Sequence, residues 1–276
     1  WSNDQKTIVS DAQGKVLLRV LPKEKFQRKI DELNYLSALD LGDVCFSTPL
    51  SVELIEDKVH YTTSYIEGTD LEDILASLSD KEQIRLGHQA GTVLKAIHHQ
   101  IRIEDDGSWA KRYGAKIDRK IETYEKSGFH FEHDASLIQK IHDLKPYLKD
   151  RPMSFQHGDY HIGNFLLTPS GDLAILDFDR WDIGDPWEEF NRIVWCREKS
   201  PLFTSAMIDA YFDFQIPPNF FELLFLYVAV NAVGSIAWAV DYGEEEVKVM
   251  LRLIKQLDED TDHFTKIIPA WYIQTK

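Results

Sequence analysis

The chain has 276 residues, 43% of them hydrophobic, which is enough to bury one large core or two adjoining ones and excludes a disordered or fibrous protein. Its 31 Lys and Arg against 46 Asp and Glu give a formal charge of −15, which argues against nucleic acid and anionic membrane surfaces as partners. Cys45 and Cys196 are too few for a disulfide framework, so we expect a cytoplasmic protein.

The first third of the chain predicts strands with one helix between them. Residues 15–20 and 59–66 are short and rich in β-branched or aromatic residues, as strands are. Between them, Pro22 stands just upstream of apolar residues at helical spacing. These apolar residues are Phe26, Ile30, Leu33, Leu36 and Leu39. We expect residues 1–68 to form a small, strand-rich lobe, with its boundary between Ile66 and Thr69.

Helical spacing dominates the rest of the chain, residues 69–276. Ser79 stands three residues before Glu82, a pairing that caps the start of a helix. Two more amphipathic helices with charged outer faces are predicted around 117–124 and 137–148. We therefore expect a second, larger and mainly helical lobe.

Residues 220–240 are nearly all apolar over a length that could span a bilayer. Polar residues interrupt this run, acidic residues flank it, and no cluster of Lys or Arg marks a cytoplasmic side. We therefore expect a buried helix of the large lobe and no membrane partner.

Residues that carry chemistry gather between positions 155 and 190. Residues 157–164 read His-Gly-Asp-Tyr-His-Ile-Gly-Asn, and residues 176–179 read Leu-Asp-Phe-Asp. Two short strands around a Thr-Pro-Ser-Gly turn at 168–171 predict a hairpin between these runs. A hairpin brings its open ends together, so Asn164 and Asp177 should emerge from neighbouring strands about 4.8 Å apart.

The predicted pair of oxygen ligands suits Mg²⁺ bound together with a nucleotide, because it leaves room for phosphate oxygens and water. Asn164 and Asp177 are therefore the predicted metal ligands. Asp159, five residues before Asn164, would lie in the same loop and accept a hydrogen bond from a substrate hydroxyl, as a catalytic aspartate does. We expect His157 to brace this loop through hydrogen bonds.

The segment resembles the aminoglycoside phosphotransferase-like kinase family, which also includes choline kinases and other small-molecule kinases. The resemblance rests on His-Gly-Asp with an Asn five residues after the Asp, on Asp-Phe-Asp at 177–179 and on Gly-Asp-Pro at 184–186. Tyr-Ile-Glu-Gly at 65–68 is similar to the family's lobe linker. The resemblance implies an α+β, two-lobed protein-kinase-like fold with a small β-rich N-lobe (1–68) and a larger, mainly helical C-lobe (69–276).

The same resemblance implies a nucleotide site in the N-lobe. Arg19 would contact the phosphates and pair with Glu32 on the following helix, with Lys15 and Lys23 as alternative cations. The implied cofactors are Mg²⁺ and ATP as co-substrate, with GTP as an alternative nucleotide.

Main-chain groups of the lobe linker would hold the adenine, through the carbonyl of Ser64 and the amide of Ile66. Ser2 and Asn3 would be the end of a phosphate-binding loop whose glycine is expected just before Trp1. The N-lobe as given would then lack part of its N-terminus.

The sequence leaves the acceptor open among aminoglycosides, macrolides, choline-like amines, sugars and homoserine-like alcohols. Residues 177–189 hold six acids and one base, and this charge would attract an ammonium-bearing substrate unless it is merely a solvated acidic face. Four residues are the candidates to line the acceptor site: Asp179, Asp182, Asn231 and Asp241.

We therefore predict an ATP- and Mg²⁺-dependent phosphotransferase, a monomer or dimer, that phosphorylates a hydroxyl of a small molecule, with cationic ones such as aminoglycosides among the candidates. A protein or lipid kinase of the same fold is one alternative. Against it, the eight residues from Asp177 to Asp185 leave no room for an activation segment of protein-kinase length. A nucleotide-binding module without catalysis is the other alternative, because Arg19 stands where protein kinases have Lys.

Overall fold

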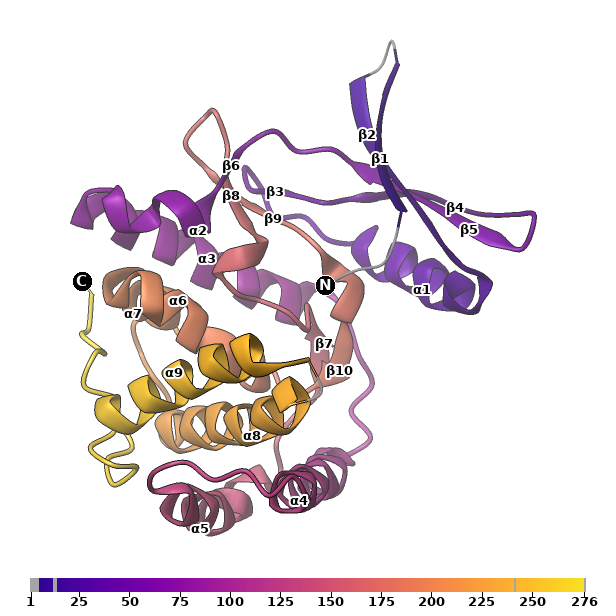
Figure 1. Ribbon diagram of the computed structural model, residues 1–276. Coiled ribbons are helices and arrows are strands. Elements are labelled where there is room, and N and C mark those ends of the chain that lie inside the picture. The colour runs from indigo at the N-terminus through magenta and orange to yellow at the C-terminus, as the bar shows by residue number, and fades with distance from the viewer. Residues whose placement is uncertain (1–4, 12–13, 241, 276) are drawn as a thin grey trace.

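The N-terminal strands form one antiparallel sheet in the computed structural model, which describes residues 5–11, 14–240 and 242–275. The predicted strands at 15–20 and 59–66 are confirmed as the two central neighbours of this sheet, the second ending two residues early. Glu56 and Asp57 form the turn between the strand that ends at Ile55 and the one that begins at Lys58, and both have positive φ, as tight hairpins require. The sheet order is β1 (Gln5–Asp11), β2 (Gly14–Pro22), β5 (Lys58–Ser64) and β4 (Pro49–Ile55) (Figure 1).

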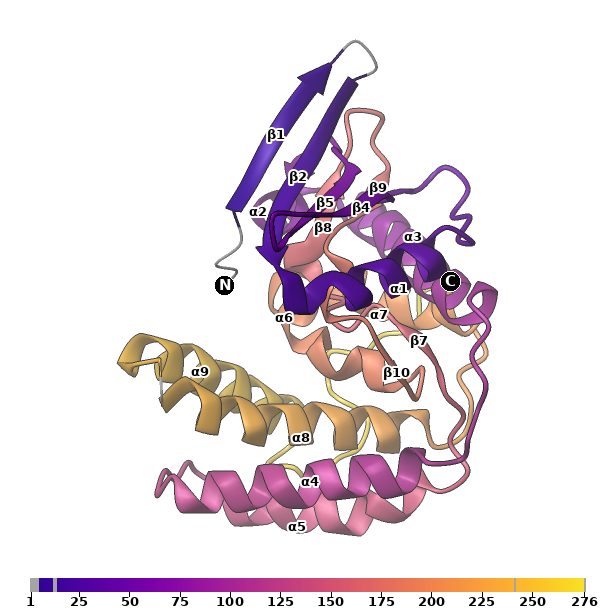
Figure 2. The same cartoon turned by 90° about the vertical axis from the view of Figure 1, so that its right-hand side faces the viewer.

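Helix α1 (Phe26–Leu36) packs against this sheet, as the helical spacing predicts (Figure 2). The helix stops at Leu36 and does not reach Leu39. Its buried positions are Lys29, Glu32 and Leu36, so the apolar spacing located the helix but not the face that it buries. Three side chains form the core of this part: Leu21, Val59 and Tyr61.

A second sheet joins strands from the two predicted lobes. The hairpin of β8 and β9 is confirmed, with Phe165 opposite Ile175 and the amide of Gly171 donating to the carbonyl of Thr168 at 2.9 Å. The sheet order is β3 (Cys45–Phe46), β9 (Leu173–Ile175), β8 (Phe165–Leu167) and β6 (Thr69–Asp70).

A two-stranded pair holds the chain that follows the hairpin. Strand β10 (Asp182–Gly184) runs antiparallel to β7 (Ser154–Gln156). The segment after Asp177 is therefore tied down within a few residues, and the loop that leads from β7 to β8 passes beside it.

Helices make up most of the chain after residue 70. Helix α3 (Asp80–Gln100) begins where the sequence predicts, with the Oγ of Ser79 accepting from the amide of Glu82 at 3.3 Å. The other helices are α2 (Leu71–Ile74), α4 (Trp109–Lys126), α5 (Asp134–Leu144), α6 (Ile193–Lys199), α7 (Pro201–Tyr211), α8 (Phe220–Val240) and α9 (Glu244–Asp260). Short 3-10 turns lie at Lys23–Lys25, Leu75–Ser77, Lys145–Leu148, Ile162–Asn164, Phe178–Arg180 and Glu188–Arg192.

Helix α8 is the one helix in the described ranges that is long and apolar enough to cross a membrane. It lies between α9 on one side and α4 with α5 on the other (Figure 2). Residues along its whole length are buried, including Leu226, Val230 and Ile236. Burial inside the helical part therefore explains the apolar composition of α8, as predicted for a core helix.

The strand-rich and helical parts lie at opposite ends of the molecule (Figures 1 and 2). The first sheet and α1 form one end, with the β8–β9 hairpin beside the sheet, and the antiparallel helices α4, α5, α8 and α9 form the other. The exact division at residue 68 stays a prediction.

Candidate active site

The loop before β8 requires glycine at position 158. Gly158 has a φ of +82°, and a Cβ on it would lie 1.8 Å from the carbonyl oxygen of Arg180. A side chain would therefore be both strained and in collision with the segment after the hairpin. The amide of Gly158 donates to Oε1 of Glu189 at 2.9 Å, which anchors the residue just before Asp159.

His157 is fully buried beneath this loop and braces it. Its Nδ1 accepts from the amide of Asp159 at 3.2 Å, so the proton is on Nε2, which donates to the carbonyl oxygen of Leu176 at 2.9 Å. Burial lowers the pKa of the imidazole, which favours this neutral form. The predicted bracing role of His157 is confirmed.

Asn164 connects the loop to the hairpin. Its Nδ2 donates to the carbonyl oxygen of Asp159 at 2.8 Å, which leaves its amide oxygen available to a ligand. Its carbonyl accepts from the amide of Leu176, the residue before Asp177, at 2.9 Å. The three residues that the sequence singled out therefore gather at the open end of one hairpin.

Asp177 is held there in a left-handed conformation with φ of 59°. Its amide donates to the Oγ of Ser47 at 3.2 Å, and its Oδ1 accepts from the amide of Asp179 at 3.4 Å. The carboxylate stays 37% exposed. A partly exposed carboxylate beside an available amide oxygen is the kind of hard donor pair that Mg²⁺ binds together with phosphate oxygens, so these residues fit that ion.

Three basic side chains surround the carboxylate of Asp159. Nε of Arg192 lies 2.9 Å from Oδ1, Nε2 of His161 lies 3.4 Å from the same atom, and Nε of Arg180 lies 3.6 Å from Oδ2. Burial raises the pKa of Asp159, but His161 and the two guanidinium groups close to the carboxylate outweigh it and hold this pKa well below its usual range. Asp159 is therefore an ionised hydrogen-bond acceptor and a weak base.

A buried ion cluster links the first sheet and α1 to the segment after the hairpin. The carboxylate of Asp179 accepts from both Arg19 on β2 and Lys29 on α1. Nη1 of Arg19 also lies 3.6 Å from Oδ1 of Asp177. Burial raises the pKa of Asp179, yet Lys29 and Arg19 lower it to about 2. The strand-rich part thus contacts the hairpin end through Arg19.

The expected pairing of Arg19 with Glu32 is wrong. Oε2 of Glu32 accepts from Lys29 at 2.6 Å, and Oε1 accepts from the hydroxyl of Tyr61 at 2.5 Å. Lys29 stands one turn before Glu32 on the same helix, so it takes the carboxylate, and Arg19 reaches Asp179 instead. Lys15 and Lys23, the alternative cations, form exposed ion pairs with Glu67 and Asp57.

The remaining predicted nucleotide residues lie at or just after the end of β5, or outside the described residues. Ser64 ends β5 and exchanges hydrogen bonds with Thr48, its amide donating to the Thr48 carbonyl and its Oγ accepting from the Thr48 amide, both at 2.9 Å. Ile66 follows in the connection to β6. Ser2 and Asn3 lie outside the described residues. The contacts predicted for all four stay predictions.

Comparison with known proteins identifies the family of this chain. The sequence profile of the phosphotransferase enzyme family matches residues 1–222. The chain belongs to this family. The predicted family is thereby confirmed. The search of curated proteins finds no match for the sequence.

Several solved structures of aminoglycoside phosphotransferases share the architecture of this phosphotransferase. The apo form of a thermostable mutant of APH(4)-Ia has a TM-score of 0.64 at 16% identity, over 92% of this chain and 90% of that one. The gentamicin complex of APH(2")-IIa has a TM-score of 0.59 at 16% identity, over 92% and 89%. ADP-bound APH(2'')-Ib has a TM-score of 0.59 at 17% identity, over 92% and 90%. These similarities confirm the predicted two-lobed, kinase-like fold.

A pocket of about 430 Å³ opens beside Asp159 in this phosphotransferase. Asn231 of α8, one of the four acceptor candidates, lies in its wall. Within the described part of the chain, the wall includes neither Asp179, which is bound by Arg19 and Lys29, nor Asp182, which is exposed on β10. Asp241 lies outside the described residues. Asp179 and Asp182 therefore do not line this pocket, because one faces the first sheet and the other solvent.

Sequence reasoning missed three basic residues of this family member's candidate site. Arg192 lies in a 3-10 turn beside Asp159, Lys29 is buried in α1, and Lys120 reaches the pocket from α4. Lys29 and Glu32 at helical spacing were a detectable pattern, because a Lys and a Glu three apart pair on one helix face. Nothing local to Arg192 or Lys120 marks them, since each acts through contacts far along the chain.

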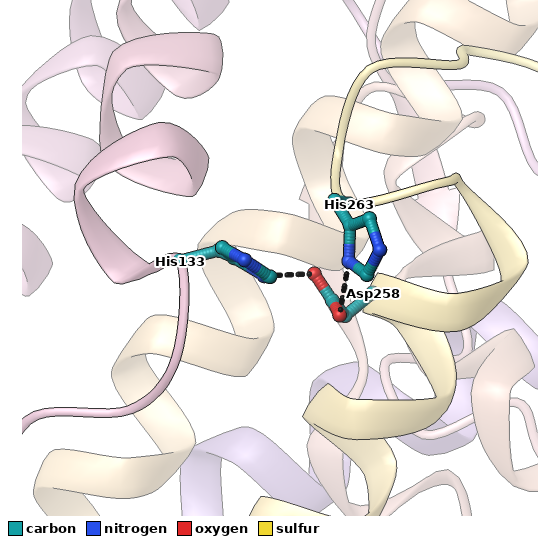
Figure 3. Close-up of side chains that lie close together, drawn as sticks. All are labelled: His133, Asp258 and His263. Atoms are coloured by element: carbon teal, nitrogen blue, oxygen red, sulfur yellow. Dashed lines mark hydrogen bonds and ion pairs between the residues drawn. The ribbon is translucent and has the colours of Figure 1, made fainter.

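A second group of possible metal ligands lies away from the hairpin, where α5 begins and α9 ends (Figure 3). Nδ1 of His133 lies 3.0 Å from Oδ1 of Asp258, and Nδ1 of His263 lies 3.0 Å from Oδ2. Two imidazoles and one carboxylate would suit Zn²⁺ better than Mg²⁺. The hydrogen bonds already satisfy Asp258, so the cluster ties α5 to α9 without needing a metal.

Proposed function

We propose that the protein transfers the terminal phosphoryl group of ATP to a hydroxyl of a small molecule. The observation that carries this is the position of Asp159, which lies in the wall of the pocket and accepts a hydrogen bond through its carbonyl from Asn164 at the hairpin end. A hydroxyl in the pocket and a nucleotide at the hairpin end would meet at this residue. Membership of a phosphotransferase family supports the reaction class.

Asp159 accepts a hydrogen bond from the acceptor hydroxyl and orients its oxygen toward the phosphorus. Its low pKa makes it a weak base, so its contribution is positioning, and the proton moves late as the new P–O bond forms. The neighbouring Arg192 and Arg180 add positive charge close to the phosphoryl group that is being transferred.

The hairpin end supplies the metal ligands in this proposal. Asn164 and Asp177 would hold Mg²⁺, which when bound neutralises phosphate charge during the transfer. Arg19, held by Asp179 next to Asp177, contacts the phosphates from the side of the first sheet. Lys29 and Glu32 act indirectly: Lys29 binds both Glu32 and Asp179, and Asp179 in turn holds Arg19.

The nucleotide base is assigned to the end of β5. The carbonyl of Ser64 and the amide of Ile66 would hold adenine in this proposal, and Ser2 and Asn3, which lie outside the described residues, stay the predicted phosphate contacts. That related structures contain ADP, as in APH(2'')-Ib, supports ATP as co-substrate, with GTP as the alternative to be compared. The state as monomer or dimer and the cytoplasmic location stay predictions.

The test compares two variants, each of which lacks one carboxylate. Asp159→Ala should abolish phosphoryl transfer, measured as ADP release with a panel of hydroxylated metabolites and antibiotics, while binding of a fluorescent ATP analogue persists. Asp182→Ala, an equal charge change at an exposed site on β10, is the matched control and should keep full turnover. Undiminished turnover of the Asp159 variant would refute the assignment.

The rival functions give different results in the same assay. A protein kinase would phosphorylate a generic protein substrate, and a silent nucleotide-binding module would release no ADP with any acceptor. The direct path from Asp177 into β10, which pairs with β7, supports a small acceptor because it leaves no activation segment to dock a polypeptide.

A further inference from the structure

The charge of the pocket differs from the charge of the whole protein. The chain carries a formal −15, yet the pocket wall holds Lys120, Arg180, Arg192 and His161 against three acids, Glu72, Asp159 and Glu246. Two of those acids are already matched, Asp159 by the two arginines and Glu72 by Lys199 at 3.3 Å. The net acidity of the protein is therefore not offered to a ligand in this pocket.

Several of the acids after the hairpin are also paired inside the fold, whereas Asp182 is exposed to solvent. Asp179 is bound by Arg19 and Lys29, as described above. Asp185 accepts two hydrogen bonds from Arg151, at 2.6 and 2.8 Å, and Glu188 accepts from Lys116 at 3.0 Å. The acidic run of residues 177–189 thus supports structure and provides no anionic wall for an ammonium-bearing substrate.

Lys120 is the basic residue of the pocket wall for which no ion pair is found among the described residues, and Glu246 is the acid in the same position. Its side chain crosses α8 at Gly234, where a Cβ would lie 2.7 Å from its Cδ, Cε and Nζ, so glycine makes the path possible. Nζ makes one contact, with the carbonyl of Val230 at 3.4 Å. In the described ranges no carboxylate pairs with it. An ammonium group deep in a wall, facing a cavity and lacking an anion, has unused donors for a ligand.

Burial makes the charged form of Lys120 less favourable. Loss of solvent and, after it, nearby Lys116 together lower its pKa from 10.5 to about 8, while Glu188 acts in the opposite direction. A bound anion would relieve that cost. The side chain keeps part of its surface open, because that surface faces the pocket.

Much of the rest of the pocket wall is apolar, with Asn191, Asn231 and Ser235 as polar interruptions. One face of α8, from Val228 to Trp238, lines it over about 15 Å at 1.5 Å per residue. A parallel face of α9, from Met250 to Leu257, and Trp195 of α6 complete the apolar lining. Such a surface gains from covering hydrocarbon or ring carbons and gains nothing from a sugar bearing many ammonium groups.

We propose that the acceptor is a largely apolar alcohol that carries one anionic group, with its anion on Lys120, its body between α8 and α9 and its hydroxyl at Asp159. This inference rests on the proposed function, since it names the acceptor of the same site. It also opposes the expectation, drawn from the acidic run of residues 177–189, that a cation such as an aminoglycoside is the substrate.

Three alcohols of equal length test the charge preference. They are ω-hydroxydodecanoate, dodecanediol and ω-aminododecanol, with gentamicin as the polycation. Binding is followed by isothermal calorimetry and transfer by ADP release, each with wild type, Lys120→Met and the control Lys126→Met, which removes the same charge from an exposed position of α4. Wild type and Lys126→Met should bind the hydroxy acid at least tenfold more tightly than the amine, and Lys120→Met should lose that preference.

The results separate this inference from the proposed function. Tighter binding or faster phosphorylation of gentamicin or the amino alcohol would overturn the anionic acceptor while leaving a phosphotransferase. An unchanged preference in Lys120→Met would overturn the role of Lys120. Lysine-dependent binding of the hydroxy acid without ADP release from any compound would support the ligand class and overturn the phosphotransferase function. A higher melting temperature of unliganded Lys120→Met would support the inference, because a lysine kept for packing alone would lower it on removal.

Discussion

Arg192 places its Nε 2.9 Å from Oδ1 of Asp159, from a turn that lies 33 positions further along the chain. Neither atom has a well-aligned hydrogen-bond partner, so the contact is an ion pair that acts by charge. Both residues line the pocket. Arg192 is therefore a positioning residue for the carboxylate that receives the acceptor hydroxyl.

Arg192→Met is expected to lower kcat by about 10- to 100-fold with little change in the KM for ATP, because the carboxylate loses its fixed orientation. Steady-state ADP release measures both constants. Arg192→Lys should restore part of kcat, whereas Arg180→Met, which removes a more exposed and more distant cation, should have a smaller effect. Equal kcat in Arg192→Met and wild type would contradict the role.

Lys29→Met is expected to lower the free energy of unfolding by about 3–5 kcal/mol, because it leaves the buried carboxylate of Glu32 without a cation. Adding Glu32→Gln should recover much of this loss, since it removes the stranded charge. Urea unfolding followed by circular dichroism measures the difference. Lys23→Met, which breaks an exposed pair with Asp57, should stay within about 0.5 kcal/mol of wild type. A Lys29 variant as stable as this control would show that the cluster contributes little.

The kcat/KM for an anionic acceptor should fall about tenfold per pH unit above pH 8, because only protonated Lys120 attracts the anion and its pKa is about 8. The charged groups that face Lys120 are Lys116 and Arg119 on α4 and Glu188 and Arg192 on the opposing turn. Lys120→Arg, which stays charged, should abolish the decline. A profile unchanged by that substitution would assign the titration to another group.

Lys120 should also leave a pH dependence in stability. Its pKa is about 8 in the folded protein and 10.5 in the unfolded chain, so the unfolded chain binds more protons between these values. Stability contributed by this group therefore rises as pH increases through that window and is lost below it. Urea unfolding at both ends of the window, with Lys120→Met as reference, measures the slope. The absence of any difference between the two proteins would mean that Lys120 is not desolvated.

Gly234→Ala is expected to raise the KM for an anionic acceptor about tenfold without loss of stability. The new Cβ would displace the flexible end of Lys120 from the pocket, while alanine favours the helix over glycine by about 1 kcal/mol. Acceptor kinetics and the melting temperature are measured together. Gly114→Ala, on α4 and outside the pocket wall, gives the same gain in helix propensity and should leave the KM unchanged.

The local parts of the candidate site could be predicted because short-range interactions determine them. The turn at residues 168–171 closes a hairpin whatever surrounds it, so Asn164 and Asp177 had to meet near its open end. The cap at Ser79 and the buried brace of His157 follow from contacts within a few residues or across one strand pair. These contacts need little knowledge of the rest of the fold.

The sequence by itself determined the kinase-like family, the hairpin and the three residues at its mouth. Only the tertiary structure decided that Lys29 takes Glu32, that Arg192 holds Asp159 and that Lys120 stands unmatched in the acceptor pocket. The physical reason is that a charge is neutralised by whichever partner packing brings close, and these partners lie on different elements or on a helix face that the apolar pattern did not identify. Total charge could not reveal this, because the electrostatics of a pocket depend on the few groups in its wall and on how many of them are already paired.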